Sequence, residues 1–336
     1  MNTLIGLVII AIGSFGQSSS YVPINKVKDW AWESFWLTQG IFAWLLFPLL
    51  GALLAVPEGS SLWQILTVDS SAALKAMMYG ILWGVGGLTF GLSMRYLGVA
   101  LGQSIALGTC AAFGTLIPAI KEGTNLFQGE GLILLIGVCI TLAGIFVIGF
   151  AGSLRARNMS EEDKKKAIKD FALKKGILVA LLCGAMSACF ALGLAAGEPL
   201  VVDGVSDLFK SLPATLMVTC GGFITNAVYC LYQNSKNKTF GDYGKSSLYV
   251  NNLLFCALAG ILWYSQFFGL SIGKSFLEPG SVMMLFSWTI LMALNVFFSN
   301  IWGIILKEWK GVSKMTIWIL ITGLVILVFS LVYPNI

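Results

Sequence analysis

The chain has 336 residues, of which 57% are hydrophobic and only 11% are charged, and its mean hydropathy is +0.85. Because a water-soluble domain carries about 25% charged residues, this composition excludes a soluble domain and indicates an integral membrane protein. The net charge is +5, and the chain has no histidine, the commonest general base of enzymes. We therefore expect a membrane protein that is not an enzyme.

Ten apolar stretches are long enough to cross the hydrocarbon core, which takes roughly 20 residues. Alternating strand patterns are absent, so the spans are predicted to be helices and the fold an all-α membrane protein. The predicted spans are residues 2–22, 35–56, 73–95, 99–120, 131–152, 174–196, 208–233, 248–272, 280–306 and 313–333.

Basic residues are distributed unevenly among the connecting loops. The loops that follow odd-numbered spans contain 17 Lys and Arg residues, and those that follow even-numbered spans contain 4. Since cytoplasmic loops are enriched in Lys and Arg, we expect the odd loops in the cytoplasm and both termini outside the cell. The first span has no basic residues before it, so we interpret it as an uncleaved helix and not as a signal peptide.

Two short strings in the third span recur in the eighth. Gly-Ile-Leu-Trp at 80–83 returns at 260–263, and Phe-Gly-Leu-Ser at 90–93 returns at 268–271. Five spans separate the copies, so they run through the membrane in opposite directions. This predicts two inverted five-helix repeats, an arrangement found in many secondary transporters. The gap between the strings differs by two residues, about 200° of helix rotation, so only one string keeps its facing unless a bulge absorbs the difference.

The only long polar stretch, residues 153–175, carries eight basic and four acidic side chains. It divides the chain into a first repeat, residues 1–152, and a second, residues 176–336. A solvated cytoplasmic linker is the favoured interpretation, and a contact with lipid head groups or a regulatory partner is the alternative.

The seventh span has a polar face, because its residues recur at steps of three and four; they are Thr215, Thr219, Gly222, Asn226, Tyr229 and Gln233. Such a face must meet other helices or a wet cavity. Packing through interhelical hydrogen bonds is the favoured interpretation of its Ser and Thr residues.

Four strings resemble the bacterial L-rhamnose/proton symporter family, within the drug/metabolite transporter superfamily. They are YVPINKVKDWAWESFW at 21–36, WGVGGLTFGLSMRYLG at 83–98, LWYSQFF at 262–268 and LKEW at 306–309. The resemblance implies a ten-helix protein of the bacterial inner membrane with a central cavity, importing L-rhamnose or a related deoxysugar with a cation. Gly87 and the stretch EPGSV at 278–282 depart from the family pattern, so the exact sugar and the ion, H⁺ or Na⁺, stay open.

A sugar site needs amides that both donate and accept hydrogen bonds, and an indole face for the less polar side of the ring. The predicted spans supply both. For each residue taken singly, a role in helix packing or at the membrane interface is at least equally well supported. The candidate substrate-binding residues are Gln17, Trp83, Gln103, Asn226, Trp263, Gln266, Trp288 and Asn295.

Coupling requires a group that changes charge or holds a cation. Glu33, Glu198 and Glu278 lie at the margins of spans and are the candidate coupling residues. A place in the head-group layer is the favoured alternative, because a charge at the bilayer centre costs ~2.5–3.5 kcal/mol. Sodium held by carbonyl and hydroxyl oxygens is a further alternative.

Other classes are less well supported. An ATP-driven pump would need a Walker motif, and YGKSS at 243–247 and IGKSF at 272–276 lack its first glycine. The seven cysteines show no CxxC spacing, so we expect no metal site and no cofactor. An exporter of the same fold is the main alternative, although it would normally carry a membrane-embedded acid. We expect sugar and lipid as partners, no nucleic acid, and a monomer or weak homo-oligomer.

Overall fold

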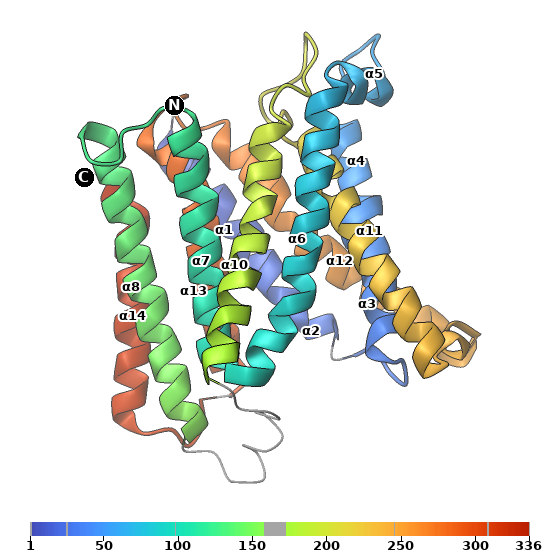
Figure 1. Cartoon of the computed structure of the whole chain (residues 1–336), viewed down its shortest axis with the longest axis vertical. Helices are drawn as coiled ribbons and strands as arrows, with labels where there is room; N and C mark the ends of the chain where they lie inside the picture. The colour runs from blue at the N-terminus through green and yellow to red at the C-terminus, as the bar shows by residue number, and fades with distance from the viewer. Residues whose placement is uncertain are drawn as a thin grey trace. The chain divides into compact units, whose positions relative to one another are not determined.

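The computed structural model describes residues 2–24, 26–97, 99–157, 173–244, 246–307 and 309–335, and over these residues it has helices and no strand (Figure 1). Within this part of the chain, nine helical stretches are long and apolar enough to cross a membrane, and Thr3–Ser19 is a shorter apolar helix. The prediction of an all-α chain with about ten membrane helices is therefore confirmed.

The helices that correspond to the ten predicted spans end within a few residues of the predicted boundaries. In chain order they are α1 (Thr3–Ser19), the continuous run of α3 (Trp32–Gly40), η1 (Ile41–Leu46) and α4 (Phe47–Leu53), α6 (Ser70–Leu97), α7 (Val99–Lys121), α8 (Gly129–Arg157), α10 (Leu173–Ala196), α11 (Leu212–Asn237), α12 (Ser246–Lys274), α13 (Val282–Ile305) and α14 (Lys314–Val332).

Short helices in the loops were not predicted; they are α2 (Tyr21–Ile24), α5 (Leu62–Thr67), η2 (Phe240–Gly244) and η3 (Tyr333–Asn335). Capping explains where several helices begin. Ser61 and Gln64 form a reciprocal capping box at the start of α5. The Ser281 hydroxyl accepts a hydrogen bond from the Met284 amide at 3.2 Å and so begins α13.

The second predicted span differs from a simple α-helix. Its middle, η1, is a π-helix, which joins α3 and α4 without a break. A π-helical turn contains an extra residue, so the side chains that follow it are rotated relative to those of an α-helix. Because Ile41–Leu46 consists of Ile, Phe, Ala, Trp and Leu, nothing in its composition indicates a π-helix.

The contacts divide the chain into two compact units. The first contains Met1–Gly84 and Leu192–Phe276, and the second contains Val85–Ala191 and Leu277–Ile336. Each unit includes residues from both predicted repeats, so units and repeats are different divisions of the chain. The predicted linker lies largely outside the described residues, which stop at 157 and resume at 173.

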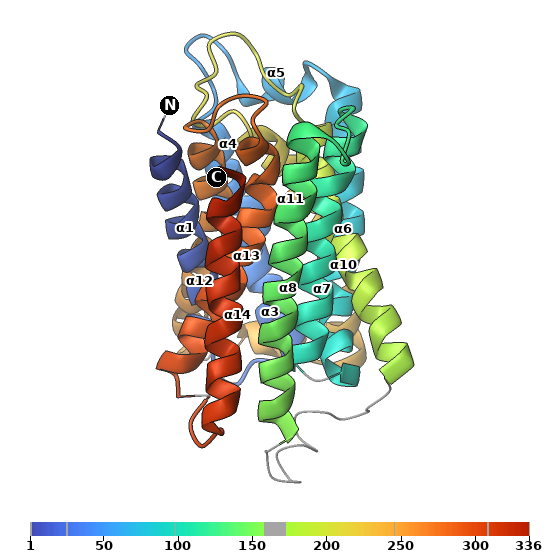
Figure 2. The same cartoon turned by 90° about the vertical axis from the view of Figure 1, so that its left-hand side faces the viewer.

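In the first unit, glycines allow helix backbones to approach closely. Helices α1 and α12 lie side by side (Figure 2). A Cβ at Gly13 would lie 2.7 Å from the Ser265 carbonyl oxygen and 3.2 Å from the Cα of Gly269. Small residues at such contacts are typical of helices packed in a membrane.

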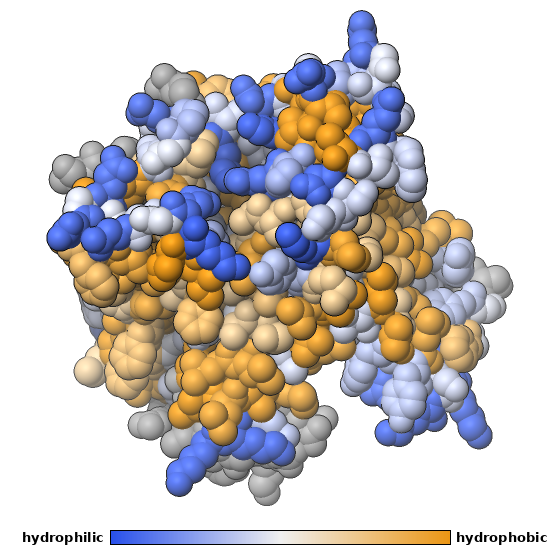
Figure 3. All heavy atoms as spheres, turned by 45° about the horizontal axis from the view of Figure 1, so that its top comes forward, coloured by the Kyte–Doolittle hydropathy of each residue, from blue (hydrophilic) through white to orange (hydrophobic). Residues whose placement is uncertain are grey.

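In the second unit, α8 and α14 lie side by side (Figures 1 and 2). Buried residues from these two helices and α13 form one hydrophobic cluster, which includes Ile145, Ala293 and Leu324. Other apolar side chains of the same helices face outward, and Phe146 is 67% exposed. Figure 3 shows hydrophobic residues over much of the visible face, as expected where a protein contacts lipid.

Candidate functional site

Four indole rings meet in the first unit. Trp44 lies at their centre, with ring centroids 5.5 Å from Trp36, 5.9 Å from Trp83 and 6.0 Å from Trp263, all in edge-to-face geometry. Trp83 and Trp263 are themselves 5.8 Å apart. We call these four residues the tryptophan cluster. Its members come from the continuous run of α3 and η1, from α6 and from α12, so the cluster joins three separate stretches of the chain.

Two glycines make room for the cluster. A Cβ at Gly40, at the end of α3, would lie 2.6 Å from the Trp44 ring. A Cβ at Gly222, in α11, would overlap the Trp83 ring. The Trp44 and Trp83 rings therefore occupy space that a side chain at position 40 or 222 would fill.

Asn226 binds Trp36, an outer member of the tryptophan cluster, by a hydrogen bond. Its side-chain oxygen accepts a hydrogen bond from Trp36 Nε1 at 2.9 Å, and its side-chain nitrogen donates to the Gly222 carbonyl at 2.8 Å. Asn226 is buried. Both ends of its amide are thus engaged within the protein, which suits a residue that positions Trp36 beside Trp44.

Helix α12 contributes two of the predicted site residues. Gln266 is buried, and its side-chain nitrogen donates to the Trp263 carbonyl at 3.1 Å. Phe267 packs against the Trp263 ring at 5.2 Å. In α1, Gln17 is partly buried, and its side-chain oxygen accepts a long hydrogen bond, 3.4 Å, from Ser18. The first unit therefore brings Trp83, Trp263 and Gln266 into one region.

The remaining predicted site residues belong to the second unit. Trp288, in α13, stacks on Phe190 with ring centroids 5.9 Å apart and donates from Nε1 to the Cys110 carbonyl at 3.4 Å. Asn295 is also in α13 and is buried. Gln103 lies in α7, but its side chain is outside the described part of the structure. Both the ring and the N–H of Trp288 therefore have partners within the second unit.

Two residues of this region were missed by the sequence reasoning. Gln39 and Trp44 are each only 4% exposed. Among the described residues, the Gln39 side-chain oxygen and Trp44 Nε1 are buried without a hydrogen-bond partner. A buried polar group that stays unpaired costs about 1–3 kcal/mol, so both atoms call for an explanation.

The candidate coupling residues lie in different surroundings. Glu33, in the first turn of α3, is 6% exposed, and its side-chain oxygen accepts hydrogen bonds from Asn237 at 2.9 Å and Thr239 at 2.8 Å. Glu198 and Glu278 are exposed and lie in loops. Only Glu33 of the three is therefore held in a buried hydrogen-bonded position.

A second buried carboxylate, Asp242, lies in the same hydrogen-bonded group. It accepts from the Ala31 amide at 2.7 Å and the Ser34 hydroxyl at 2.9 Å. Asn234 connects the two carboxylates, because its oxygen accepts from both Ser34 and Thr239. We call Glu33, Ser34, Asn234, Asn237, Thr239 and Asp242 the polar network. It ties the start of α3 to the end of α11 and to η2.

Tyr243 borders the polar network. Its hydroxyl accepts a hydrogen bond from the Asn234 side-chain nitrogen at 3.3 Å. Burial raises the pKa of Tyr243 above its usual value, and the hydrogen bond from Asn234 partly opposes this change. Tyr243 therefore stays neutral at physiological pH.

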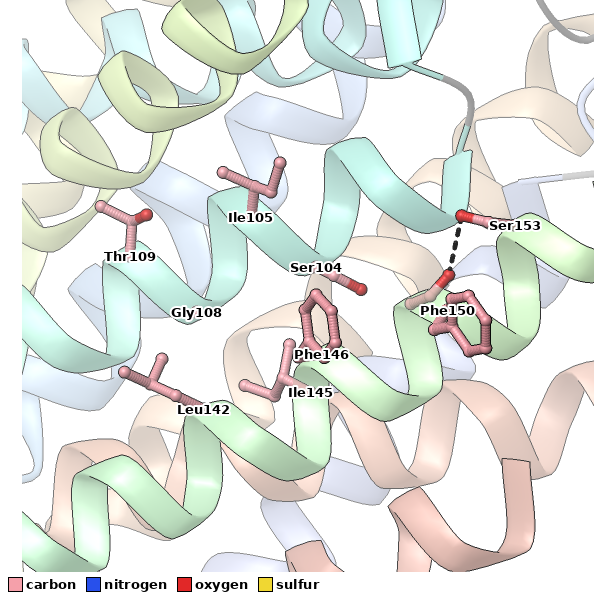
Figure 4. Close-up of a pocket in the computed structure, with 10 residues that line it drawn as sticks. Ser104, Ile105, Gly108, Thr109, Leu142, Ile145, Phe146, Phe150 and Ser153 are labelled. Carbon is pink, nitrogen blue, oxygen red and sulfur yellow. Dashed lines mark hydrogen bonds between the residues drawn. The ribbon is translucent and has the colours of Figure 1, made fainter. Parts of the chain in front are cut away.

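A groove of about 350 Å³ lies between α7 and α8 in the second unit (Figure 4). Its lining is mainly apolar and includes Ile105, Leu142, Phe146 and Phe150. The Ser153 hydroxyl at its edge donates to the Gly149 carbonyl at 3.0 Å. None of the predicted site residues lines this groove, and its chemistry does not suit a sugar.

No group of three or more His, Cys, Asp and Glu side chains that could hold a metal ion occurs among the described residues. The side-chain polar groups described at the tryptophan cluster are amides and indoles. They can hydrogen-bond a neutral, hydroxyl-rich molecule, and the rings offer apolar faces.

The sequence is similar to a known protein family over almost its whole length. A family model described as L-rhamnose-proton symport protein matches residues 1–333. The L-rhamnose-proton symporters of Yersinia pestis (strain Pestoides F) and Yersinia pseudotuberculosis serotype O:3 (strain YPIII) are each 31% identical to this chain over 339 residues. These alignments cover 97% of this chain and 96% of each relative. The chain therefore belongs to the L-rhamnose-proton symport protein family.

Proposed function

We propose that this protein imports L-rhamnose together with a proton by alternating access. The observation that carries the proposal is the family match over residues 1–333, together with relatives named L-rhamnose-proton symporter that align along almost their whole length. The nine candidate membrane spans found among the described residues support a transporter. Proton coupling is preferred to sodium coupling because the family and the relatives are named for it.

The tryptophan cluster is the proposed sugar site. L-Rhamnose carries a methyl group where common hexoses carry a hydroxymethyl group, so an aromatic face suits its less polar side. In this proposal Trp83 and Trp263 provide that face, and Gln266 binds a hydroxyl. Asn226 acts by positioning Trp36, because its own amide is already engaged. Gln17, Gln103, Trp288 and Asn295 are kept as further candidates.

Glu33 is the proposed coupling residue. It is buried and hydrogen-bonded, whereas Glu198 and Glu278 are exposed in loops. One proton that crosses a membrane potential of 100 mV supplies about 2.3 kcal/mol, which is enough for a roughly 50-fold accumulation of a neutral sugar. A single protonatable group is therefore sufficient.

The proposed architecture consists of two inverted five-helix repeats, residues 1–152 and 176–336, in a bacterial inner membrane, as in the drug/metabolite transporter superfamily. The repeated strings in α6 and α12 support it. The 17 to 4 distribution of basic residues supports a cytoplasmic linker at 153–175 and external termini.

Transport in proteoliposomes tests the function. Radiolabelled L-rhamnose is expected to accumulate when an inward proton gradient is imposed, and a protonophore is expected to abolish the accumulation. An imposed sodium gradient with no proton gradient serves as the control and is expected to give only equilibration. Accumulation driven by sodium alone, or no uptake of L-rhamnose in either condition, would contradict the proposal.

Cysteine labelling tests the orientation. In a variant without the seven native cysteines, Ser160→Cys in the linker is expected to resist an impermeant thiol reagent added to intact cells. Glu58→Cys, at an exposed position in the loop before α5, is expected to react and is the matched control. Rapid labelling at position 160 together with protection at position 58 would reverse the orientation.

A further inference from the structure

The two unpaired polar atoms, the Gln39 side-chain oxygen and Trp44 Nε1, come from the same continuous helical run. Gln39 lies in the last turn of α3 and Trp44 in the π-helix that follows, so the two residues are five positions apart. A π-helix closes its hydrogen bonds between residues five apart, which brings side chains at this spacing toward the same side of the helix. Single π-helical turns occur frequently at functional sites. Helical geometry, burial and missing hydrogen bonds therefore point to the same two residues.

We propose that Trp44 Nε1 and the Gln39 side-chain oxygen bind hydroxyl groups of the transported sugar and determine which sugar is accepted. The proposal rests on the proposed function and extends its site to two residues. The indole N–H is a donor and the amide oxygen an acceptor, so together they match a hydroxyl-rich ligand. A site that leaves its polar groups unpaired without the correct ligand discriminates strongly against analogues that lack a hydroxyl.

The rings of α6 and α12 that contact Trp44 are less buried than Trp44 itself. Trp44 is buried, whereas Trp83 and Trp263, which cover it, are each only partly buried. These rings contact Trp44 through edge-to-face pairs, which contribute little individually. Rotation of Trp83 or Trp263 about its side-chain bonds is the movement by which we expect Nε1 to become accessible to a sugar.

A competing explanation is that the Trp44 N–H is satisfied by the face of a neighbouring indole. Such N–H···π contacts exist and are weak. The two explanations differ in what removal of the N–H does. If a ring accepts it, Trp44→Phe lowers the stability and leaves sugar binding unchanged. If the sugar accepts it, Trp44→Phe weakens binding, and the stability falls only by the packing that is lost with the smaller ring.

Trp36 is the matched control, because the same change there removes an indole N–H that is paired with Asn226. The experiment measures the thermal unfolding midpoint of the purified proteins and their affinity for L-rhamnose by calorimetry. Trp44→Phe is expected to weaken L-rhamnose binding about tenfold or more and to lower the unfolding midpoint less than Trp36→Phe does, because it loses packing but no paired N–H. Trp36→Phe is expected to lower the unfolding midpoint. Gln39→Met, which keeps the length of the side chain, is expected to behave like Trp44→Phe.

Sugar analogues locate the contact. One of the three L-rhamnose analogues deoxygenated singly at position 2, 3 or 4 is expected to bind wild-type and Trp44→Phe protein with equal affinity, because the partner of Nε1 is already missing. Undiminished L-rhamnose affinity in Trp44→Phe, or an unfolding midpoint lowered as in Trp36→Phe, would overturn the inference. Failure of the wild-type protein to bind L-rhamnose would refute the proposed function, and the stability comparison would still test whether Nε1 is paired.

Discussion

Glu33→Gln is expected to leave the protein folded and able to bind L-rhamnose but unable to accumulate it in response to a proton gradient. The glutamine oxygen can still accept hydrogen bonds from Asn237 and Thr239, which hold Glu33 now, but an amide cannot carry the proton. Glu33→Ala removes both bonds and is expected to lower the free energy of unfolding by about 3 kcal/mol. Proteoliposome uptake and thermal unfolding measure the two effects.

Glu58→Gln is the control, since Glu58 is exposed in a loop outside the candidate spans. It is expected to behave as the wild-type protein in both measurements. In counterflow, labelled L-rhamnose outside the vesicles exchanges with unlabelled sugar inside them, and no proton gradient is needed. We expect Glu33→Gln to retain this exchange. If Glu33→Gln still accumulates L-rhamnose against its gradient, Glu33 only stabilises the polar network and the proton is carried elsewhere.

The membrane helices could be predicted because the hydrocarbon core imposes a length on each of them. Helix α13 was expected at 280–306 and is found at Val282–Ile305, with Ser281 as its cap. Helix α11 was expected to begin at 208 but begins at Leu212. The prediction was too early because Leu208 and Phe209 are apolar but lie in the preceding loop. Hydrophobicity alone does not separate an apolar loop from the first turn of a helix.

The π-helix and its consequences could not be predicted. Residues 41–46 have the composition of an ordinary membrane helix, and the choice between α and π depends on what the segment packs against. Gly260 of α12 contributes to that packing, since a Cβ there would lie 2.6 Å from the Phe42 side chain. Without knowledge of this contact, Gln39 and Trp44 are one amide and one indole among many.

The sequence indicated part of the candidate site. Trp83 and Trp263 were singled out by their chemistry and by the repeated strings, yet nothing in the sequence placed their rings 5.8 Å apart. Asn226 was found through the polar periodicity of its helix, but its hydrogen bond with Trp36 joins positions 190 residues apart. Such pairings depend on how helices are arranged, which one sequence without relatives does not specify.

Two neighbouring glycines of α11 face different kinds of neighbour. A Cβ at Gly221 would overlap the carbonyl oxygen of Met77 and lie 2.8 Å from the Ile81 amide nitrogen, both backbone atoms of α6. A Cβ at Gly222 would overlap the ring of Trp83, a partly buried side chain. A backbone can give way only if the helices separate, whereas a side chain can rotate.

Gly221→Ala is therefore expected to lower the free energy of unfolding by about 3 kcal/mol, the upper part of the range for overpacking, because α6 and α11 must move apart. Gly222→Ala is expected to cost less than half of that stability but to weaken L-rhamnose binding about tenfold or more, since the displaced Trp83 leaves the proposed sugar face. Thermal unfolding and calorimetry on the two purified variants measure both quantities. When Trp83→Ala is already present, the overlap is gone, so adding Gly222→Ala is expected to lower the stability no further and to leave the affinity weak. If Gly222→Ala binds L-rhamnose as tightly as the wild-type protein, the orientation of Trp83 does not matter for binding and the tryptophan cluster is not the sugar site.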